Sequence, residues 1–331
     1  MLAYTAKRLA YMVFVLFVVS IVSFILIQLP PGDFLTTQVT LLRASGTDVS
    51  EAQLESLTRR YGLDLPPHEQ YLKWMGGVLQ GDYGQSFQYN RPVRDLIGER
   101  LGLTIAISLA TLIFTFAVAI PIGIYSATRQ YSIGDYAFTT IGFIGLAIPN
   151  FLLALLIMFF LNRAFGVSVG GLFSPEFRLE PWSLAKVWDM IKHLPTPVIV
   201  IGMAGTAGLI RVMRGCLLDE LRRQYVITAR AKGQAENTVI FRYPVRVALN
   251  PVVSTIGWAL PAIVSGETIT AIVLDLPTTG PLLVGALLNQ DMYLAGSFIL
   301  FLSTLTVIGT YVSDLLLVAL DPRIRFERLK K

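Results

Sequence analysis

The sequence has little of the chemistry that many enzymes depend on. It contains one cysteine, Cys216, and two histidines, His68 and His193. A single thiol excludes an internal disulfide, and these three side chains cannot supply the four ligands of a structural zinc site. The chain also lacks the G-x-x-x-x-G-K-[ST] motif that cradles nucleotide phosphates. These absences exclude a structural zinc centre built from cysteine and histidine, and nucleotide hydrolysis through a P-loop.

Charged residues are scarce as well. They form 15% of the chain, against roughly 25% in soluble domains, and 54% of the residues are hydrophobic. The uncharged runs are long enough for helices that cross the bilayer, which needs about 20 residues, and lipid forces backbone hydrogen bonds to be made internally. We therefore predict an all-α integral membrane protein, a single membrane domain over residues 1–331. Its six transmembrane helices are predicted at residues 9–29, 101–127, 137–162, 194–213, 249–274 and 293–320.

The distribution of charge predicts the orientation of these helices. Six spans place both termini on one side, together with residues 129–135 and 211–246, and this side carries 16 Lys and Arg against six acids. The other side carries 11 Lys and Arg against 14 acids. The positive-inside rule then places both termini in the cytoplasm. The net charge of +5 follows from this topology and from contact with anionic lipid, so it indicates no nucleic-acid partner.

Residues 30–100 are predicted to form an external loop subregion with two helices. Ser50 and Gln53 have the spacing of a capping box before the first helix, which Gly62 would end. Pro67 opens the second. The second helix carries Tyr71, Trp74, Met75 and Val78. These helices either form a packed hairpin on the helix ends or cover the mouth of a pathway.

A basic cytoplasmic loop is predicted at residues 211–250. It holds eight Lys and Arg against three acids, and Gly233 separates one helical run from the next. Such a loop either docks on a cytoplasmic partner or lies on anionic lipid, where each basic residue contributes about 1 kcal/mol. Docking would depend on individual residues such as Gly233, whereas lipid attraction would depend on the number of charges alone.

A few residues allow other interpretations. Gly166 to Gly170 match G-x-S-x-G, so Ser168 with His193 as its base would be the centre of an intramembrane serine protease. Glu267 and Asp314 are acids within predicted spans. Ionisable groups at membrane depth often serve a pathway or proton transfer, although a hydrogen-bonded packing role is the alternative.

Three stretches together resemble one family. The first is Thr228-Ala-Arg-Ala-Lys-Gly233 within the basic loop; the second runs from Tyr61 to Trp74 and on to Phe87; the third is Leu320 to Arg325. They resemble permease subunits of binding-protein-dependent ABC importers, in the dipeptide/oligopeptide (peptide/nickel) branch. The first stretch resembles the family's "EAA" loop, whose pattern is Glu-Ala-Ala, three residues, then Gly. Here Gly233 matches the glycine, while Ile227-Thr228-Ala229 replaces the first three residues.

The resemblance implies a fold, partners and site residues. The fold would be that of a type I importer permease in a bacterial or archaeal inner membrane. The partners would be a second homologous permease, two ABC ATPases, an extracytoplasmic solute-binding protein and membrane lipid. This chain would bind no cofactor and catalyse no reaction, because ATP and Mg²⁺ would be bound by the ATPases. The coupling residues would be Thr228, Ala229, Arg230, Ala231, Lys232, Gly233 and Glu236.

The cargo implied by the resemblance is a dipeptide or oligopeptide. The acid of the fifth span is Glu267, whereas the family pattern leads us to expect a glutamate later, at the position that Ala271 holds. This shift makes Glu267 a candidate pathway residue, and it leaves oligosaccharides, nickel and other small solutes as alternative cargoes. A secondary transporter or channel is the more distant alternative. Such folds often show internal repeats, whereas this sequence shows no convincing repeat, and the basic loop would have no role in them.

Overall fold

The computed structural model describes residues 2–29, 58–59, 64–166, 170–256, 259 and 268–320. In these ranges the regular elements are helices, and the one β-type pairing is an isolated bridge between Gln85 and Pro92. The predicted all-α class is confirmed. The chain forms two compact units, one of residues 1–103 and 278–307 and the other of residues 104–277 and 308–331.

Within the described part of the chain, four helical stretches are long and apolar enough to cross a membrane: Ala10–Gln28 in α1 (Leu2–Gln28), α5 (Val93–Thr128), α9 (Pro195–Leu221) and Met292–Val312 in α16 (Met292–Leu320). A fifth candidate is the bent pair α6 (Ile133–Ala147) and α7 (Asn150–Phe165). The predicted span at 249–274 holds α12 (Pro244–Ser254) and α14 (Thr268–Val273) at its ends, and residues 257–258 and 260–267 lie outside the described part. Six spans therefore stay a prediction.

The predicted span at 137–162 is interrupted in the structure. Helix α6 ends at Ala147, α7 begins at Asn150, and the two axes differ by 106°. Ile148 between them is extended, with φ −91° and ψ 122°, and Pro149 follows. Proline lacks an N–H and disfavours helical geometry in the residue before it. The sequence therefore contains the cause of this bend, although hydropathy alone indicates one uninterrupted run.

The first unit is built around aromatic packing. Helix α4 (Pro67–Leu79) begins at the predicted proline, which confirms the second helix of the loop 30–100, and its Trp74 is buried. The Trp74 indole donates to Ser297 Oγ in α16 at 3.2 Å, and the Tyr71 ring meets Phe24 of α1 edge-on at 5.4 Å. These contacts favour the packed arrangement over a cover for a pathway. Ser50 and Gln53 lie outside the described residues.

A buried carboxylate holds residues 84–92 against the start of α16. Asp291 is fully buried and accepts hydrogen bonds from Ser86 Oγ at 2.5 Å and from Gln88 N at 3.1 Å. It also accepts from Leu294 N at 3.2 Å, which caps α16. Burial raises the pKa of Asp291, and these hydrogen bonds oppose part of that rise. The carboxylate thereby fixes a loop to a helix end, and it is a residue that sequence reasoning did not single out.

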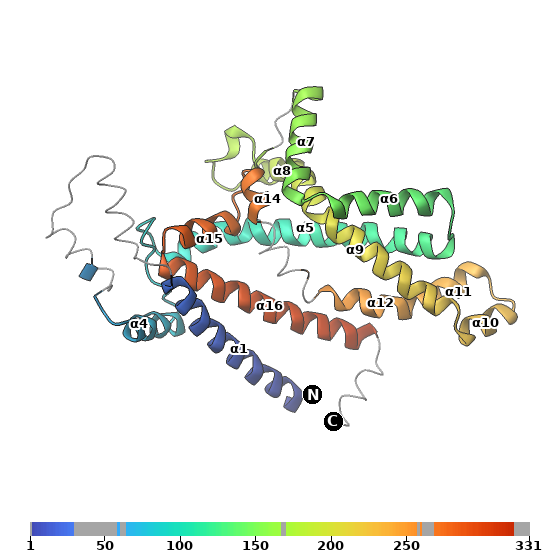
Figure 1. Ribbon diagram of the computed structural model, residues 1–331, viewed down its shortest axis with the longest axis horizontal. Coiled ribbons are helices and arrows are strands. Elements are labelled where there is room, and N and C mark those ends of the chain that lie inside the picture. The colour runs from blue at the N-terminus through green and yellow to red at the C-terminus, as the bar shows by residue number, and fades with distance from the viewer. Residues whose placement is uncertain are drawn as a thin grey trace. The chain divides into compact units, whose positions relative to one another are not determined.

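The second unit is packed around α9. Small residues allow close helix contacts here, because a Cβ at Gly145 would lie 2.7 Å from Met203 and one at Gly202 would lie 2.9 Å from Phe114. Between α9 and the end of α7 lie the short η1 (Pro175–Phe177) and α8 (Leu184–His193). Figure 1 shows α9 running from α8 toward the hairpin of α10 and α11. The first unit also includes α15 (Thr279–Leu288).

Candidate functional site

The predicted coupling residues lie in a helical hairpin that follows α9. Helix α10 (Gln224–Ala231) and helix α11 (Glu236–Arg242) are joined by a short turn, and α12 follows directly. The break falls at Gly233, as the sequence predicts, and its φ of +74° lies in the left-handed region that favours glycine. Gly233 N donates to Arg230 O at 2.9 Å and Gln234 N donates to Ala229 O at 3.4 Å. This is the Schellman pattern that ends many helices.

The space around Gly233 is open, since a Cβ there would have no neighbour within 4 Å. Backbone conformation, rather than crowding, is therefore what requires glycine at this position. The same open space leaves the turn accessible to a partner.

A small apolar core holds the hairpin together. Val226 and Ala229 of α10 pack with Val239 of α11, all three are buried, and Tyr243 packs against them. Ala229 therefore faces inward and positions its neighbours. The other six predicted coupling residues, Thr228, Arg230, Ala231, Lys232, Gly233 and Glu236, are exposed.

An ion pair links the two helices across the turn. Arg230 Nη2 lies 2.6 Å from Glu236 Oε1, and Arg230 Nε lies 3.1 Å from Glu236 Oε2. The hydrogen bond from Arg230 holds the pKa of Glu236 below its usual value, and the same bond raises the pKa of Arg230. One positive charge of the loop is therefore neutralised locally by a carboxylate from the next helix.

The hairpin is tied to α9 by buried side chains. Ile240 of α11 and Val245, Ala248 and Val252 of α12 share one apolar cluster with Met213 and Leu217 of α9. Close packing of this kind transmits displacement rather than absorbing it. A force applied to the hairpin would therefore move α9.

A groove of about 860 Å³ lies between the hairpin and the end of α5. Arg230, Glu236 and Phe241 line it from the hairpin, and Tyr125 and Arg129 line it from α5 and the residue that follows. The Arg129 guanidinium lies 5.5 Å from the centre of the Tyr125 ring. The groove is lined by two arginines and two aromatic rings, and both residue types are enriched at protein interfaces.

A second ion pair joins α6 to α9. Arg214 Nη2 lies 3.2 Å from Asp135 Oδ2, and the Asp135 carboxylate also accepts from Tyr131 N at 3.0 Å. Sequence reasoning counted both residues as charges but did not pair them. No spacing rule could have done so, because the partners are 79 positions apart.

The structure describes less about the remaining candidate residues. Glu267 and Ser168 lie outside the described residues, and Asp314 lies in α16 without a described side chain. His193 Nδ1 lies 2.8 Å from the backbone oxygen of Asp189. Across the described ranges, no group of three or more His, Cys, Asp or Glu could hold a metal ion.

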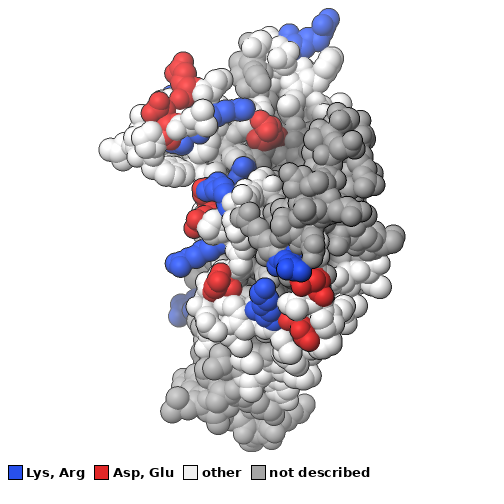
Figure 2. All heavy atoms as spheres, turned by 90° about the vertical axis from the view of Figure 1, so that its left-hand side faces the viewer, with Lys and Arg blue, Asp and Glu red and all other residues white. Residues whose placement is uncertain are grey.

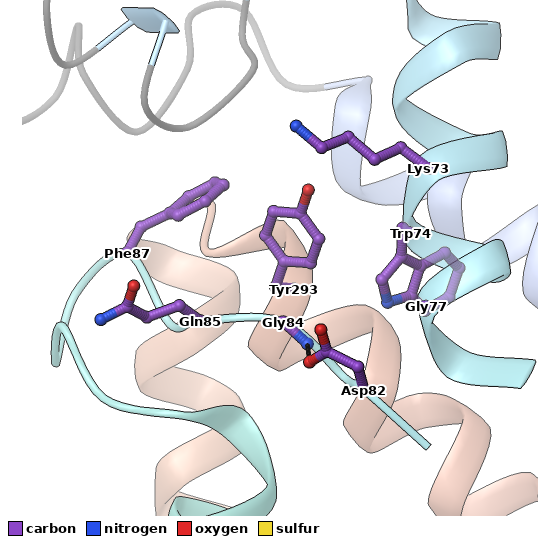
Figure 3. A pocket seen from close by; sticks show the side chains of 8 residues that line it. All are labelled: Lys73, Trp74, Gly77, Asp82, Gly84, Gln85, Phe87 and Tyr293. Carbon is purple, nitrogen blue, oxygen red and sulfur yellow. Dashed lines mark hydrogen bonds between the residues drawn. The ribbon is translucent and has the colours of Figure 1, made fainter. Parts of the chain in front are cut away.

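A small hollow in the first unit is drawn in Figure 3. It measures about 220 Å³, and the Tyr293 ring lies against Gly84, where a Cβ would approach Tyr293 Cδ1 to 2.5 Å. Asp82 accepts a hydrogen bond from Gly84 N at 2.9 Å, and Lys73 stands on the α4 side. Pockets for small ligands usually measure about 300–1,000 Å³, so this hollow is too small for a peptide. Figure 2 shows a separate point about charge: on the described part of the face that it draws, Lys and Arg are interspersed with Asp and Glu, so neither sign of charge dominates there.

Several helices long and apolar enough to cross a membrane, with a well-packed hairpin after α9, define a multi-pass membrane protein. Comparison with known proteins gives the family. Residues 119–326 match the family "Binding-protein-dependent transport system inner membrane component", and residues 1–110 match its N-terminal region. The chain belongs to this family, and it is the permease subunit of an importer that depends on a binding protein.

Similar proteins span the same length. The chain is 34% identical to the oligopeptide transport system permease protein AppB of Bacillus subtilis, over 98% of this chain and 100% of the relative. It is 31% identical to the dipeptide transport system permease protein DppB of Alkalihalophilus pseudofirmus, with 98% and 100% covered. It is 29% identical to the oligopeptide transport system permease protein OppB of Haemophilus influenzae, with the same coverage.

Proposed function

We propose that this chain forms half of the translocation pathway of an ATP-driven importer of dipeptides or oligopeptides. The observation that carries the proposal is the similarity, over nearly the whole chain, to permeases named for those two cargoes. The shifted acid Glu267 keeps oligosaccharides, nickel and other small solutes as the alternative cargoes within the same class. Glu267 itself is proposed to line the pathway.

The assembly would contain a second homologous permease, two ABC ATPases and an extracytoplasmic solute-binding protein. This chain is proposed to be non-catalytic and to hold no cofactor, so that ATP and Mg²⁺ are bound by the ATPases alone. In this arrangement the permease converts movement of the ATPases into a change of its own helices. The chain would act as a single membrane domain over 1–331.

The hairpin α10–α11 is the proposed ATPase contact. The exposed side chains of Thr228, Arg230, Ala231, Lys232 and Glu236, together with the Gly233 turn, would meet the ATPase, and Ala229 would hold them in place from below. The buried cluster of Ile240 and Val245 with Met213 supports this role, because it links the hairpin to α9. Closure of the ATPases would then shift α9 and, through the Arg214–Asp135 pair, α6.

The proposed orientation has both termini and the segment 211–250 in the cytoplasm, with 30–100 outside. The excess of Lys and Arg on the terminal side supports it. An ATPase can reach only the cytoplasmic side, so the docking role of the hairpin and the orientation stand or fall together.

Transport by the reconstituted assembly tests this function. The chain would be co-purified with its partner subunits, placed in proteoliposomes with ATP inside, and supplied outside with the binding protein. Uptake of dipeptides or oligopeptides that requires both ATP and the binding protein is the expected result. Uptake confined to oligosaccharides or nickel would reassign the cargo, and uptake without ATP would indicate a secondary transporter.

A further inference from the structure

Helix α8 (Leu184–His193) has its polarity reversed. On a helix that faces water, charged side chains point outward and apolar ones inward. Here Lys186 and Asp189 are each only 7% exposed, whereas Leu184 is 91%, Trp188 61% and Ile191 45% exposed. The three apolar residues are spaced four and three apart, so they form one stripe along the helix.

The inward polar side chains are satisfied within the protein. Asp189 accepts hydrogen bonds from Ser174 N and Ser174 Oγ, each at 2.7 Å. Lys186 Nζ donates to Glu180 O at 2.5 Å and lies 5.0 Å from the centre of the Phe173 ring. The reversal is therefore built by specific contacts and is not a helix merely lacking a neighbour.

The position of α8 along the chain fixes its level in the bilayer. Helix α9 begins at Pro195, with only Leu194 between it and the end of α8, and its first charged residue is Arg211. The uncharged part, residues 195–210, has a length of about 24 Å at 1.5 Å per residue, against a hydrocarbon core of about 30 Å. With Arg211 at the edge of the hydrocarbon core on the hairpin side, the uncharged part does not reach beyond the core. The first residue of α9 therefore lies close to the opposite edge.

We propose that α8 lies in the headgroup region of the leaflet opposite the α10–α11 hairpin, with Leu184, Trp188 and Ile191 inserted among the acyl chains. The occupant of the stripe is phospholipid because α8 leads, after Leu194 alone, into a helix that is long and apolar enough to cross the membrane. Trp182, which is also 61% exposed, adds a second indole just before α8 in the chain, and tryptophan is enriched at this depth. Lys192, exposed next to the stripe, is placed to reach lipid phosphates.

Insertion would anchor the external end of α9. The hairpin at the other end of α9 is where the ATPases are proposed to act, so a fixed external end would make α9 pivot rather than slide. The lipid contact itself does not depend on the proposed cargo or partners, and its test is independent of transport.

Nitroxide labelling tests the lipid contact. Single cysteines would replace Leu184, Trp188 and Ile191 in a Cys216→Ser background, with Glu176→Cys on the nearby η1 as the exposed, polar control. The labelled, assembled transporter would be placed in nanodiscs of phosphatidylethanolamine and phosphatidylglycerol. We expect labels at 184, 188 and 191 to meet oxygen several-fold more than a water-soluble nickel chelate, and the label at 176 to show the reverse.

Three results would overturn the proposal. Accessibility at all three positions equal to that at 176 would place the stripe in water. Shielding from both reagents would show that another protein chain covers it. Loss of nickel-chelate access only after the binding protein is added would make it a docking surface for that protein.

Tryptophan quenching guards against a label that disturbs folding. Brominated lipids should quench the wild-type fluorescence more than that of Trp188→Phe, because they should reach the indole at 188. Equal fractional quenching of the two proteins would contradict insertion.

Discussion

Two short helices flank α9, and they differ in which kind of side chain they expose: α10 exposes charged residues and α8 exposes apolar ones. At its end, α10 buries Val226 and Ala229 and exposes Arg230 and Lys232. Before its start, α8 buries Lys186 and Asp189 and exposes an apolar stripe. Helical spacing is similar in both, so periodicity shows that a helix has two faces but not which one points outward. The surrounding residues decide this, by offering either apolar contacts or hydrogen-bond partners.

The two segments also differ in how their charges are held. The Arg230–Glu236 pair is about half exposed, and such pairs contribute little because water and salt screen them. The Asp189 carboxylate is buried and accepts two hydrogen bonds from one residue, Ser174. Removing a buried acceptor leaves its donors without partners and costs more. This difference orders the predictions below.

The largest expected effect on local stability comes from Asp189→Ala. It leaves the N–H and hydroxyl of Ser174 without their acceptor, at a cost of about 3 kcal/mol. Hydrogen exchange of residues 170–193 in the purified transporter measures this loss. Glu236→Ala is the matched control, and its loss of protection is measured in the α10–α11 hairpin, where we expect a far smaller effect. Equal losses of local stability in the two segments would mean that the burial of Asp189 makes no difference.

Acid should weaken the α8 region through the same carboxylate. Burial tends to raise the pKa of Asp189, but the hydrogen bonds from Ser174 outweigh it and the pKa lies below its usual value. A lowered folded-state pKa stabilises the fold above the unfolded value of about 3.9; the contribution is lost as the pH falls through the folded value. The protection of residues 170–193 from exchange, taken relative to the intrinsic exchange rate at each pH, should therefore fall below about pH 4. Asp189→Ala should lose this dependence.

The next effect is that of Gly233→Ala. A side chain at a φ of +74° costs about 1–2 kcal/mol, even though the space is open. Transport and its coupling to ATP hydrolysis should fall while every charge is kept. Gly215→Ala in α9 is the control, because that site is equally open without positive φ and alanine favours helices by up to about 1 kcal/mol. Normal transport by Gly233→Ala would support the lipid interpretation of the basic loop.

The smallest effect is expected from the Arg230–Glu236 pair. A double-mutant cycle with Arg230→Ala and Glu236→Ala should give a coupling energy below about 1 kcal/mol, decreasing further with added salt. Thermal unfolding of the transporter at two salt concentrations measures it. A large, salt-independent coupling would show that the pair is buried in the assembly and lies within the ATPase contact.

The sequence predicts what depends on local chemistry. Hydropathy predicts α1, α5, α9 and α16, Pro67 predicts the start of α4, and Gly233 predicts the break between α10 and α11. The family resemblance is confirmed over nearly the whole chain.

What the sequence does not predict depends on tertiary partners. The reversed face of α8 requires Ser174 and Glu180 to lie beneath Asp189 and Lys186. The inward position of Ala229 requires Val239 from α11. The Arg214–Asp135 pair joins positions far apart in the chain, and no periodicity brings them together.

Site-directed cross-linking of the assembled transporter tests the central contrast most directly. In a Cys216→Ser background, cysteines at Thr228 and at Leu184 would be treated with a short bifunctional reagent in native membranes, and the products identified by mass spectrometry. We predict that Thr228→Cys links to a subunit carrying a P-loop motif and that Leu184→Cys links to no such subunit. Absence of an ATPase product from Thr228→Cys, and likewise from Lys232→Cys, would contradict the assignment of the α10–α11 hairpin as the coupling site.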